Sequence, residues 1–416
     1  MSGARAHTPA RRWHKVLAAG ILAAALLPWS ASAFLGASPA RLAAPALPNA
    51  RDTEGLLIRS LLEITQGRTT AALSTLDELL SAVPNFKLAH LVRGDLLMAQ
   101  SHELSGFGNA PNAPKQEIAD FREEARVRLE RYLSQQNAHN IPEYLWQLDR
   151  DQRYAIVVDT AKSRLYLYRN ESGAPHYVAD YYVTVGKNGS GKQKEGDKRT
   201  PLGIYFTGAQ LQQKKLSDLY GSAAYPLSYP NEWDRHQGMD GHGIWLHGTP
   251  SDTYSRPPRA SDGCVVLTNP DIKTIGPILQ SGKTPVVIAS NVQWLASEHL
   301  AAEKNDLLQA VEQWRRDWEA QDTDSYLAHY SQTFFSADHN LSSWAADKRR
   351  KQASKPSVKI GLSNISMFRY PDDQQQMVVV NFDQAFKSNV LDNQMRKRQY
   401  WVLENKHWKI LYEGAA

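Results

Sequence analysis

A histidine and a cysteine are the residues of this sequence whose types and spacing could break a covalent bond. His247 lies in the segment GIWLHGTP (243–250), and Cys264, the chain's one cysteine, ends the segment SDGC (261–264). A sulfur attacks a carbonyl carbon as the thiolate, yet an unperturbed cysteine, with a pKa of about 8.5, is only a few per cent ionised near neutral pH. A histidine within hydrogen-bond reach removes the proton and then stabilises the thiolate. The two residues therefore predict nucleophilic catalysis if the fold brings them together.

The residues beside this pair are expected to orient it. The backbone at Gly263 and Cys264 would offer N–H donors to an oxyanion, because glycine permits the close approach that such a site needs. The tautomer of His247 must be fixed by an acceptor on its second ring nitrogen. No carboxylate stands out for this role, so we expect a backbone carbonyl, that of Gly248, to supply it.

Strands are predicted on either side of the pair. His247 ends one predicted strand and Cys264 begins another, so neighbouring strands would bring the two side chains together despite their separation in sequence. Apolar and polar residues alternate in short runs from residue 154 to about 290, as in a mostly-β domain. A Gly- and Lys-rich loop at 186–196 interrupts the strands.

These motifs resemble those of the L,D-transpeptidase (YkuD-type) catalytic domain, in which a His-Gly is followed some fifteen residues later by Ser/Thr-His-Gly-Cys. The upstream runs VGK (185–187), GD (196–197) and TPLG (200–203) are typical of the same domain. We place the domain at residues 151–292. The resemblance implies a mostly-β sandwich or barrel with the cysteine under a flexible lid.

The resemblance also assigns roles to individual residues. By this likeness Cys264 is the nucleophile, His247 is the base, and the Gly248 carbonyl orients it. Gly263 would lie at the oxyanion hole, and Ser261 would support the loop. No cofactor is implied, and no metal, since His242 and His247 lack a third ligand at a suitable spacing.

The sequence departs from the family pattern at two positions. Asp262 stands where histidine is usual, and Val266 stands where arginine is common. Neither change removes the nucleophile or its base. A carboxylate close to a thiolate would raise the thiol pKa, so we expect Asp262 to point away or to bind Arg259.

The chemistry that the resemblance implies is acyl transfer on peptidoglycan stem peptides. Cys264 would attack the carbonyl between meso-diaminopimelate and terminal D-alanine, expel D-alanine and hold the acyl group as a thioester. A stem-peptide amine would then give a 3→3 cross-link, water a tripeptide, and a lysine of an outer-membrane protein or lipoprotein an anchor. Diaminopimelate carries a carboxylate, so Arg259 and Arg256 are candidates to bind it, and Trp245 could line the groove.

Two other functions remain open. The same residues would serve an L,D-carboxypeptidase or an amidase that hydrolyses stem-peptide or protein–peptidoglycan bonds. The other hypothesis is a non-catalytic scaffold that binds the cell wall, and it predicts that Cys264→Ala retains all function. Each of these hypotheses places the protein in cell-wall biogenesis and cell shape.

The N-terminal residues predict export. A basic stretch, twelve apolar residues at 16–27 and the small residues at 31–33 are typical of a cleaved secretory signal, which we place at 1–33. An Ala- and Pro-rich linker at 34–50 follows. We therefore expect a periplasmic protein. A single cysteine excludes a disulfide within the chain.

Two further regions flank the predicted catalytic domain. Helical periodicity at 51–150 is similar to part of a tetratricopeptide array, with Gly67 and Pro84 at the helix ends. Residues 300–416 read as a helix pair, the second helix at 326–335, followed by four antiparallel strands. This segment is similar to the nuclear-transport-factor/SnoaL-like cone. Either flank is a candidate to bind a protein partner.

Composition agrees with a folded, multidomain chain. Of the 416 residues, 42% are hydrophobic and 22% charged, which excludes wholesale disorder. A net charge of +5 spread over this length argues against a nucleic-acid partner. The predicted fold class is multidomain, with N-terminal α-helical hairpins, a central mostly-β sandwich or barrel and a C-terminal α+β cone.

Overall fold

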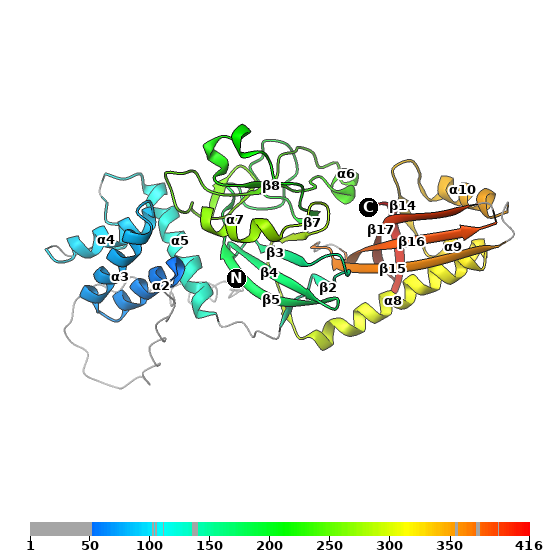
Figure 1. Cartoon of the computed structure of the whole chain (residues 1–416), viewed down its shortest axis with the longest axis horizontal. Coiled ribbons are helices and arrows are strands. Elements are labelled where there is room, and N and C mark those ends of the chain that lie inside the picture. Colours follow the sequence, from blue (N-terminus) through cyan, green and yellow to red (C-terminus); the bar gives the residue numbers. More distant parts are fainter. Residues whose placement is uncertain are drawn as a thin grey trace, which may run out of the picture. The chain divides into compact units, whose positions relative to one another are not determined.

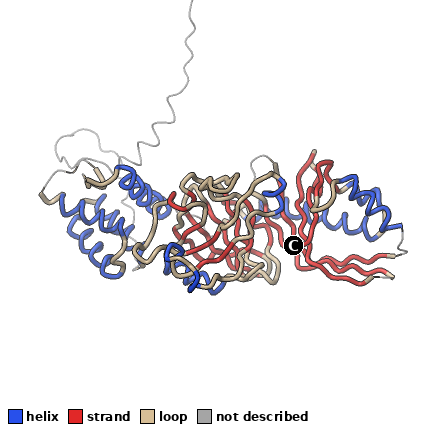
Figure 2. Tube along the Cα trace, turned by 90° about the horizontal axis from the view of Figure 1, so that it is seen from above, coloured by secondary structure: helices blue, strands red, loops and turns tan. Residues whose placement is uncertain are grey.

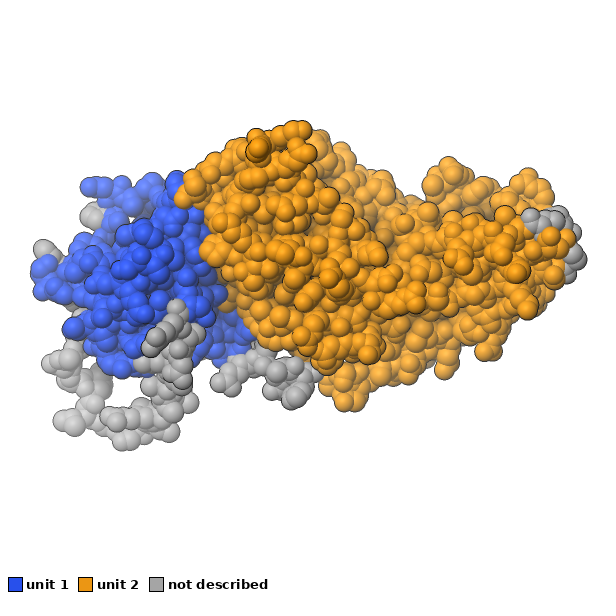
Figure 3. Space-filling model, in the orientation of Figure 1, with its two compact units in different colours: residues 1–135, 252–257 blue, residues 136–251, 258–416 orange. Residues whose placement is uncertain are grey.

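The computed structural model describes 52–101, 104, 106–110, 112–134, 140–353, 357–371, 375–389 and 391–416. The predicted signal peptide and linker lie outside these residues. The chain divides into two compact units, of which unit 1 holds residues 1–135 and 252–257 and unit 2 holds 136–251 and 258–416 (Figure 3). Figure 2 shows helices and loops in the first unit and strands throughout the centre of the second.

Unit 1 is helical. Its helices are α2 (Thr53–Thr65), α3 (Thr69–Ala82), α4 (Lys87–Met98) and α5 (Lys115–Leu133) (Figure 1). The side chain of Asp52 caps α2 by accepting from the backbone N–H of Gly55 at 2.7 Å. Leu57, Leu76 and Leu79 are fully buried between the helices. The predicted N-terminal helices are confirmed.

The central region of unit 2 is built on a five-stranded sheet with the order β5-β4-β3-β12-β7. Its strands are β3 (Tyr154–Asp159), β4 (Arg164–Glu171), β5 (Ala174–Tyr182), β7 (Gly203–Phe206) and β12 (Pro285–Ala289). Strands β3 and β12 are runs of Val, Ile and Ala that are buried almost throughout, as expected for strands covered on both faces. This sheet supports the smaller strands that carry the site.

The smaller strands form two further sheets. One has the order β11-β9-β8, and the other pairs β6 with β10. Their bounds are β6 (Val185–Gly186), β8 (Ala224–Pro226), β9 (Trp245–His247), β10 (Arg259–Ser261) and β11 (Val265–Val266). Two short helices, α6 (Glu232–His236) and α7 (Asn269–Ile275), lie in the connections. Leu246 and Val265 are fully buried in one core with Ile156 and Val158 of the large sheet.

The C-terminal region of unit 2 combines helices with a second large sheet, whose order is β14-β18-β17-β16-β15-β2. The helices are α8 (Ser297–Glu319), α9 (Thr323–Ala328) and α10 (Leu341–Ala353). The strands are β14 (Tyr330–Phe335), β15 (Val358–Arg369), β16 (Met377–Ser388), β17 (Asp392–Glu404) and β18 (His407–Ala415). Trp314 and Trp401 are fully buried between helix and sheet. The predicted fold class, including this α+β part, is confirmed.

One predicted element of this region is wrong. We expected a single helix at 326–335, but α9 ends at Ala328 and β14 follows it. Strand β14 pairs in parallel with β18. Tyr330 and Phe334 are buried, and an aromatic-rich run fits a pleated, half-buried surface better than a helix. The segment 326–335 therefore holds the end of a helix and a strand, and the spacing of its apolar residues alone did not distinguish the two.

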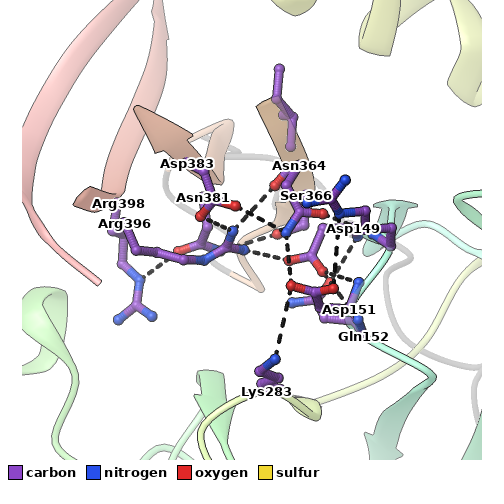
Figure 4. Close-up of polar contacts among 12 residues, drawn as sticks. Asp149, Asp151, Gln152, Lys283, Asn364, Ser366, Asn381, Asp383, Arg396 and Arg398 are labelled. Carbon is purple, nitrogen blue, oxygen red and sulfur yellow. Dashed lines mark hydrogen bonds and ion pairs between the residues drawn. The ribbon is translucent and has the colours of Figure 1, made fainter. Parts of the chain in front are cut away.

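The central and C-terminal regions of unit 2 share strands and ion pairs. Strand β2 (Leu145–Gln147), which precedes the central sheet in sequence, pairs with β15. Nearby, Arg396 of β17 forms ion pairs with Asp149 and with Asp383, the latter at 2.8 Å (Figure 4). The C-terminal region is therefore bonded to the central region at its edge.

Candidate active site

The pairing of strands β9 and β11 brings the segments that carry His247 and Cys264 alongside each other. The two strands pair in parallel, with Leu246 opposite Val265 and His247 opposite Val266. Side chains alternate between the two faces of a strand. His247 therefore shares a face with Val266. Continued by one residue, the register sets Cys264, just before β11, opposite Trp245, on the same face as His247 and two positions from it.

The ring of His247 is held in one orientation. It is almost fully buried, and its Nδ1 lies 2.7 Å from the carbonyl oxygen of Gly248, the acceptor expected from the sequence. A carbonyl oxygen can only accept, so Nδ1 carries the proton and Nε2 is the basic nitrogen. The ring of Tyr220 contacts the imidazole edge-on, with centroids 5.2 Å apart.

Gly248 also allows a second contact that the sequence analysis missed. Asn269, at the start of α7, accepts from the N–H of Ser222 at 2.8 Å and donates to the carbonyl of Thr249 at 2.8 Å. A Cβ at position 248 would lie 2.2 Å from the Asn269 side-chain oxygen. Position 248 therefore needs a glycine, because the Asn269 side chain, which bonds to Ser222 and Thr249, occupies the space that a Cβ would fill.

Cys264 is half-buried, and its Sγ lies 3.3 Å from the carbonyl oxygen of Gly243. Ser261 holds the loop before it, because its hydroxyl donates to the carbonyl of Cys264 at 2.6 Å. The same hydroxyl accepts from the N–H of Gly263 at 3.1 Å. Ser261 therefore bonds to both ends of the Gly263–Cys264 turn.

The backbone N–H of Gly263, one of the two amides expected to serve an oxyanion, donates to the Ser261 hydroxyl in this structure. Gly263 has φ +130°, and a Cβ there would lie 2.8 Å from the carbonyl oxygen of Arg199. The glycine is therefore required by backbone geometry at this position.

Thr200 is a buried residue of the site to which the sequence analysis gave no role. Its hydroxyl accepts from the N–H of Gly186 at 2.9 Å and donates to the carbonyl of Gly263 at 3.0 Å. It thus joins the end of β6 to the cysteine loop. The sequence signal was present, since Thr200 opens the run TPLG that supported the family resemblance.

The Gly- and Lys-rich loop is organised around one carboxylate. Asp197 accepts from the backbone N–H groups of Gln193, Lys194 and Arg199 and from the ammonium of Lys192. Burial alone would raise the pKa of Asp197, but these donors hold it at about 2. The loop is therefore an ordered turn around a permanently charged acid.

Asp262, the first departure from the family pattern, was expected to point away or to bind Arg259. It is largely exposed, and its carboxylate lies 3.1 Å from the ammonium of Lys187, whereas no ion pair with Arg259 occurs among the described residues. Both charges stand at the edge of the site. The second departure, Val266, is buried in β11, where its side chain is part of the strand packing.

The residues predicted to bind substrate occupy different surroundings. Arg259 begins β10 and is exposed, while Trp245 is half-buried with its ring 4.7 Å from that of Tyr220. Arg256 belongs to the segment 252–257, which is part of unit 1. The roles of these three residues stay predictions.

A cavity of about 880 Å³ lies apart from the cysteine. It is bordered by residues 146–154, by the β4–β5 turn at 169–175, and by Leu300 and Lys304 of α8. Within the described ranges no three His, Cys, Asp or Glu side chains gather as metal ligands. No helix of that same part is long and apolar enough to cross a membrane.

Comparison with family models identifies the two regions of unit 2. Residues 153–288 match the YkuD L,D-transpeptidase catalytic domain, and residues 306–414 match the Cds6 C-terminal NTF2-like domain. The chain therefore carries an L,D-transpeptidase catalytic domain of the YkuD family followed by an NTF2-like domain of the Cds6 type. The family resemblance stated from the sequence is confirmed.

Solved structures resemble the chain over most of its length. Bd1075 from Bdellovibrio bacteriovorus has a TM-score of 0.59 at 28% identity, over 67% of this chain and 98% of that one. The helical cell-shape-determining protein Pgp2 from Campylobacter jejuni has a TM-score of 0.57 at 26% identity, over 65% of this chain and 94% of its own. No curated protein matches the sequence.

Proposed function

We propose that this protein is a periplasmic cysteine L,D-transpeptidase that transfers acyl groups on peptidoglycan stem tetrapeptides. The observation that supports the proposal is the β9–β11 pairing, which brings the segment after Cys264 alongside the strand that ends at His247, whose Nδ1–H donates to the Gly248 carbonyl. With Nδ1–H donating to this carbonyl, Nε2 is the basic nitrogen that would accept the thiol proton.

The first half of the reaction forms a thioester. His247 takes the thiol proton, and the Cys264 sulfur attacks the carbonyl carbon between diaminopimelate and D-alanine. The Cys264 amide N–H donates to the resulting oxyanion. The protonated His247 then gives its proton to the departing nitrogen, so that D-alanine leaves as the amine and the acyl group remains on sulfur.

The second half releases the acyl group. An incoming amine loses a proton to His247 as its nitrogen attacks the thioester carbon, and the sulfur leaves as thiolate. An amine of a second stem peptide gives a 3→3 cross-link, and a lysine of an outer-membrane or lipoprotein acceptor gives a protein anchor. A role in cell shape would follow from such cross-links, and Pgp2, which this chain resembles, is a helical cell-shape-determining protein.

Arg259 is our candidate for the diaminopimelate carboxylate. Its side chain is exposed, it stands two residues before Ser261, and it has no carboxylate partner among the ion pairs of the described residues. Arg256 and Trp245 remain secondary candidates.

Digestion of peptidoglycan sacculi tests the proposal. Sacculi are incubated with the purified chain or with Cys264→Ala, cut by a muramidase, and the fragments are resolved by mass. Dimers joined through two diaminopimelates, present only with the wild-type chain, support the transferase. Tripeptides without dimers would show the hydrolase instead. Identical digests from both proteins would show a non-catalytic scaffold.

A further inference from the structure

The NTF2-like domain holds the short helix α6 of the catalytic domain by an ion pair. Arg398 of β17 donates to both carboxylate oxygens of Glu232, at 3.0 and 3.2 Å, and the hydroxyl of Tyr400 donates to the same carboxylate at 2.9 Å. Arg398 and Glu232 are each only about one-seventh exposed. Burial alone would raise the pKa of Glu232, but Arg398 and these hydrogen bonds keep it below its usual value.

A second contact from the NTF2-like domain reaches the N-terminus of the same helix. The amide of Asn231 donates to the hydroxyl of Tyr370, at the end of β15, at 2.9 Å. The Asn231 side-chain oxygen accepts from the N–H of Asp234 at 2.8 Å, and the Asp234 carboxylate accepts from the N–H of Asn231. This reciprocal capping box fixes the first turn of α6. Three residues of the NTF2-like domain, Arg398, Tyr400 and Tyr370, thus contact the beginning of this helix.

The chain that leaves α6 runs directly to the cysteine. Met239 donates from its N–H to the carbonyl of Asp234 at 2.9 Å, which folds the segment back onto the helix. The carbonyl of Asp240 accepts from the hydroxyl of Tyr229 at 2.7 Å. The segment ends at Gly243, whose carbonyl oxygen contacts the Cys264 Sγ at 3.3 Å.

The same segment also holds the Gly- and Lys-rich loop. Asp240 donates from its N–H to the carbonyl of Gln193 at 3.2 Å, and its carboxylate accepts from the N–H of Glu195 at 2.6 Å. A Cβ at Gly241 would lie 3.2 Å from the Cα of Glu195, so the two chains approach closely. The segment 237–243 therefore joins α6 to two borders of the active site.

We propose that the NTF2-like domain is a positioning module for the cysteine, and that it acts through Arg398, Glu232 and α6 on the carbonyl of Gly243. This inference rests on the proposed role of Cys264 as the nucleophile. The Gly243 carbonyl accepts only from the protonated thiol, so it holds the resting sulfur in place and favours the thiol over the thiolate. Arg398 and Glu232 are positioning residues, because neither contacts the sulfur.

Arg396 provides a matched control. It lies two residues from Arg398 on β17 and joins the NTF2-like domain to the catalytic region through its ion pair with Asp149, while its second partner, Asp383, belongs to the NTF2-like domain (Figure 4). Its contacts end at the junction before β3 and do not involve α6. Loss of Arg396 should weaken the attachment of the two domains without changing the surroundings of the cysteine.

The test measures the thiol and the turnover separately in the full chain. The wild type, Arg398→Ala, Arg398→Lys and Arg396→Ala are alkylated with iodoacetamide across a pH series, with intact mass as the readout. The kcat and KM for D-alanine release from a stem tetrapeptide are measured in parallel. Alkylation needs no substrate, so its result does not depend on the acyl acceptor or on turnover.

We expect Arg398→Ala to shift the alkylation midpoint to lower pH by about 0.5–1 unit, because the neutral thiol loses its acceptor. Its kcat should fall about tenfold with a smaller change in KM, because the sulfur is less well placed. Arg398→Lys should recover part of both effects. Arg396→Ala should keep the wild-type midpoint and kcat.

Two results would overturn the inference. One is an Arg398→Ala profile that coincides with the wild type. The other is an equal change in Arg396→Ala, which would show general loosening of the domains. If Arg398→Ala does not fold, the same two measurements are made on Tyr400→Phe, which removes one hydrogen bond to Glu232 and keeps the aromatic ring. A wild-type midpoint and kcat in that variant would likewise reject the inference.

Discussion

The residue that follows His247 must be a glycine because of the atoms that surround its backbone. Gly248 supplies the carbonyl that fixes the imidazole and leaves room for the side chain of Asn269. The sequence showed the first role, because a histidine tautomer needs an acceptor. It could not show the second, because Asn269 approaches through the fold and not through the local chain.

A substitution at this position has a measurable consequence. Gly248→Ala should lower the free energy of unfolding by about 1–3 kcal/mol, because the new methyl group would meet the Asn269 oxygen. Urea unfolding of Gly248→Ala, Asn269→Ala and the double variant checks this. Asn269→Ala should cost less stability in the Gly248→Ala background than in the wild type. Strictly additive losses would contradict the proposed clash.

At the scale of the element, α6 is a five-residue helix stabilised by its caps and by its neighbours. Helices this short are unstable alone. Asp234 belongs to the capping box and is almost fully buried, and this burial raises its pKa to about 6. The carboxylate is therefore neutral in the folded chain at a pH where the unfolded chain is already ionised.

The raised pKa of Asp234 predicts how stability changes with pH. Between about pH 4 and 6 the folded state binds more protons than the unfolded state, so the contribution of this group to stability falls as the pH rises. The full change is about 3 kcal/mol for a shift of about two units. Asp234→Asn should lose this component, and thermal unfolding at pH 4 and pH 7 would show it. Wild-type and variant curves that change in parallel would contradict it.

The elements also show which structural features the sequence could predict. The strands around His247 and Cys264 follow alternating or continuous apolar runs, and β9 and β11 lie where those runs place them. The run 326–335 was misread, because a short helix and a short strand share one aromatic-rich pattern. The link between Arg398 and Glu232 was not foreseen, since 166 residues separate them and no local pattern marks a cross-domain ion pair.

At the scale of the whole molecule, a piece of the His-to-Cys connection packs in the helical unit. The ring of Tyr254 lies 4.7 Å from that of Phe86 of the same unit, and the hydroxyl of Ser255 donates to Glu124 at 2.7 Å. Glu124 is buried and paired with Arg128 at 2.9 Å. The helices therefore order a segment that lies, in sequence, between the proposed base and nucleophile.

Limited proteolysis tests this attachment. Ser255→Ala should speed chymotryptic cleavage after Tyr254 about fivefold, because the loss of one buried hydrogen bond, worth about 1 kcal/mol, favours opening of the segment. Ser251→Ala is the control, since its hydroxyl binds Asp218 in unit 2 and not the helices. Equal cleavage rates in all three proteins would show that Glu124 does not hold the segment.

The central claim is that Cys264, activated by His247, forms a covalent acyl intermediate. Intact-mass measurement after incubation with a stem tetrapeptide and acid quenching tests it most directly. The wild type should gain the mass of the tripeptidyl acyl group as free D-alanine is released, and His247→Gln should form the adduct at least about 100-fold more slowly. A wild-type chain that releases D-alanine without any adduct, or an adduct that survives in Cys264→Ala, would contradict the claim.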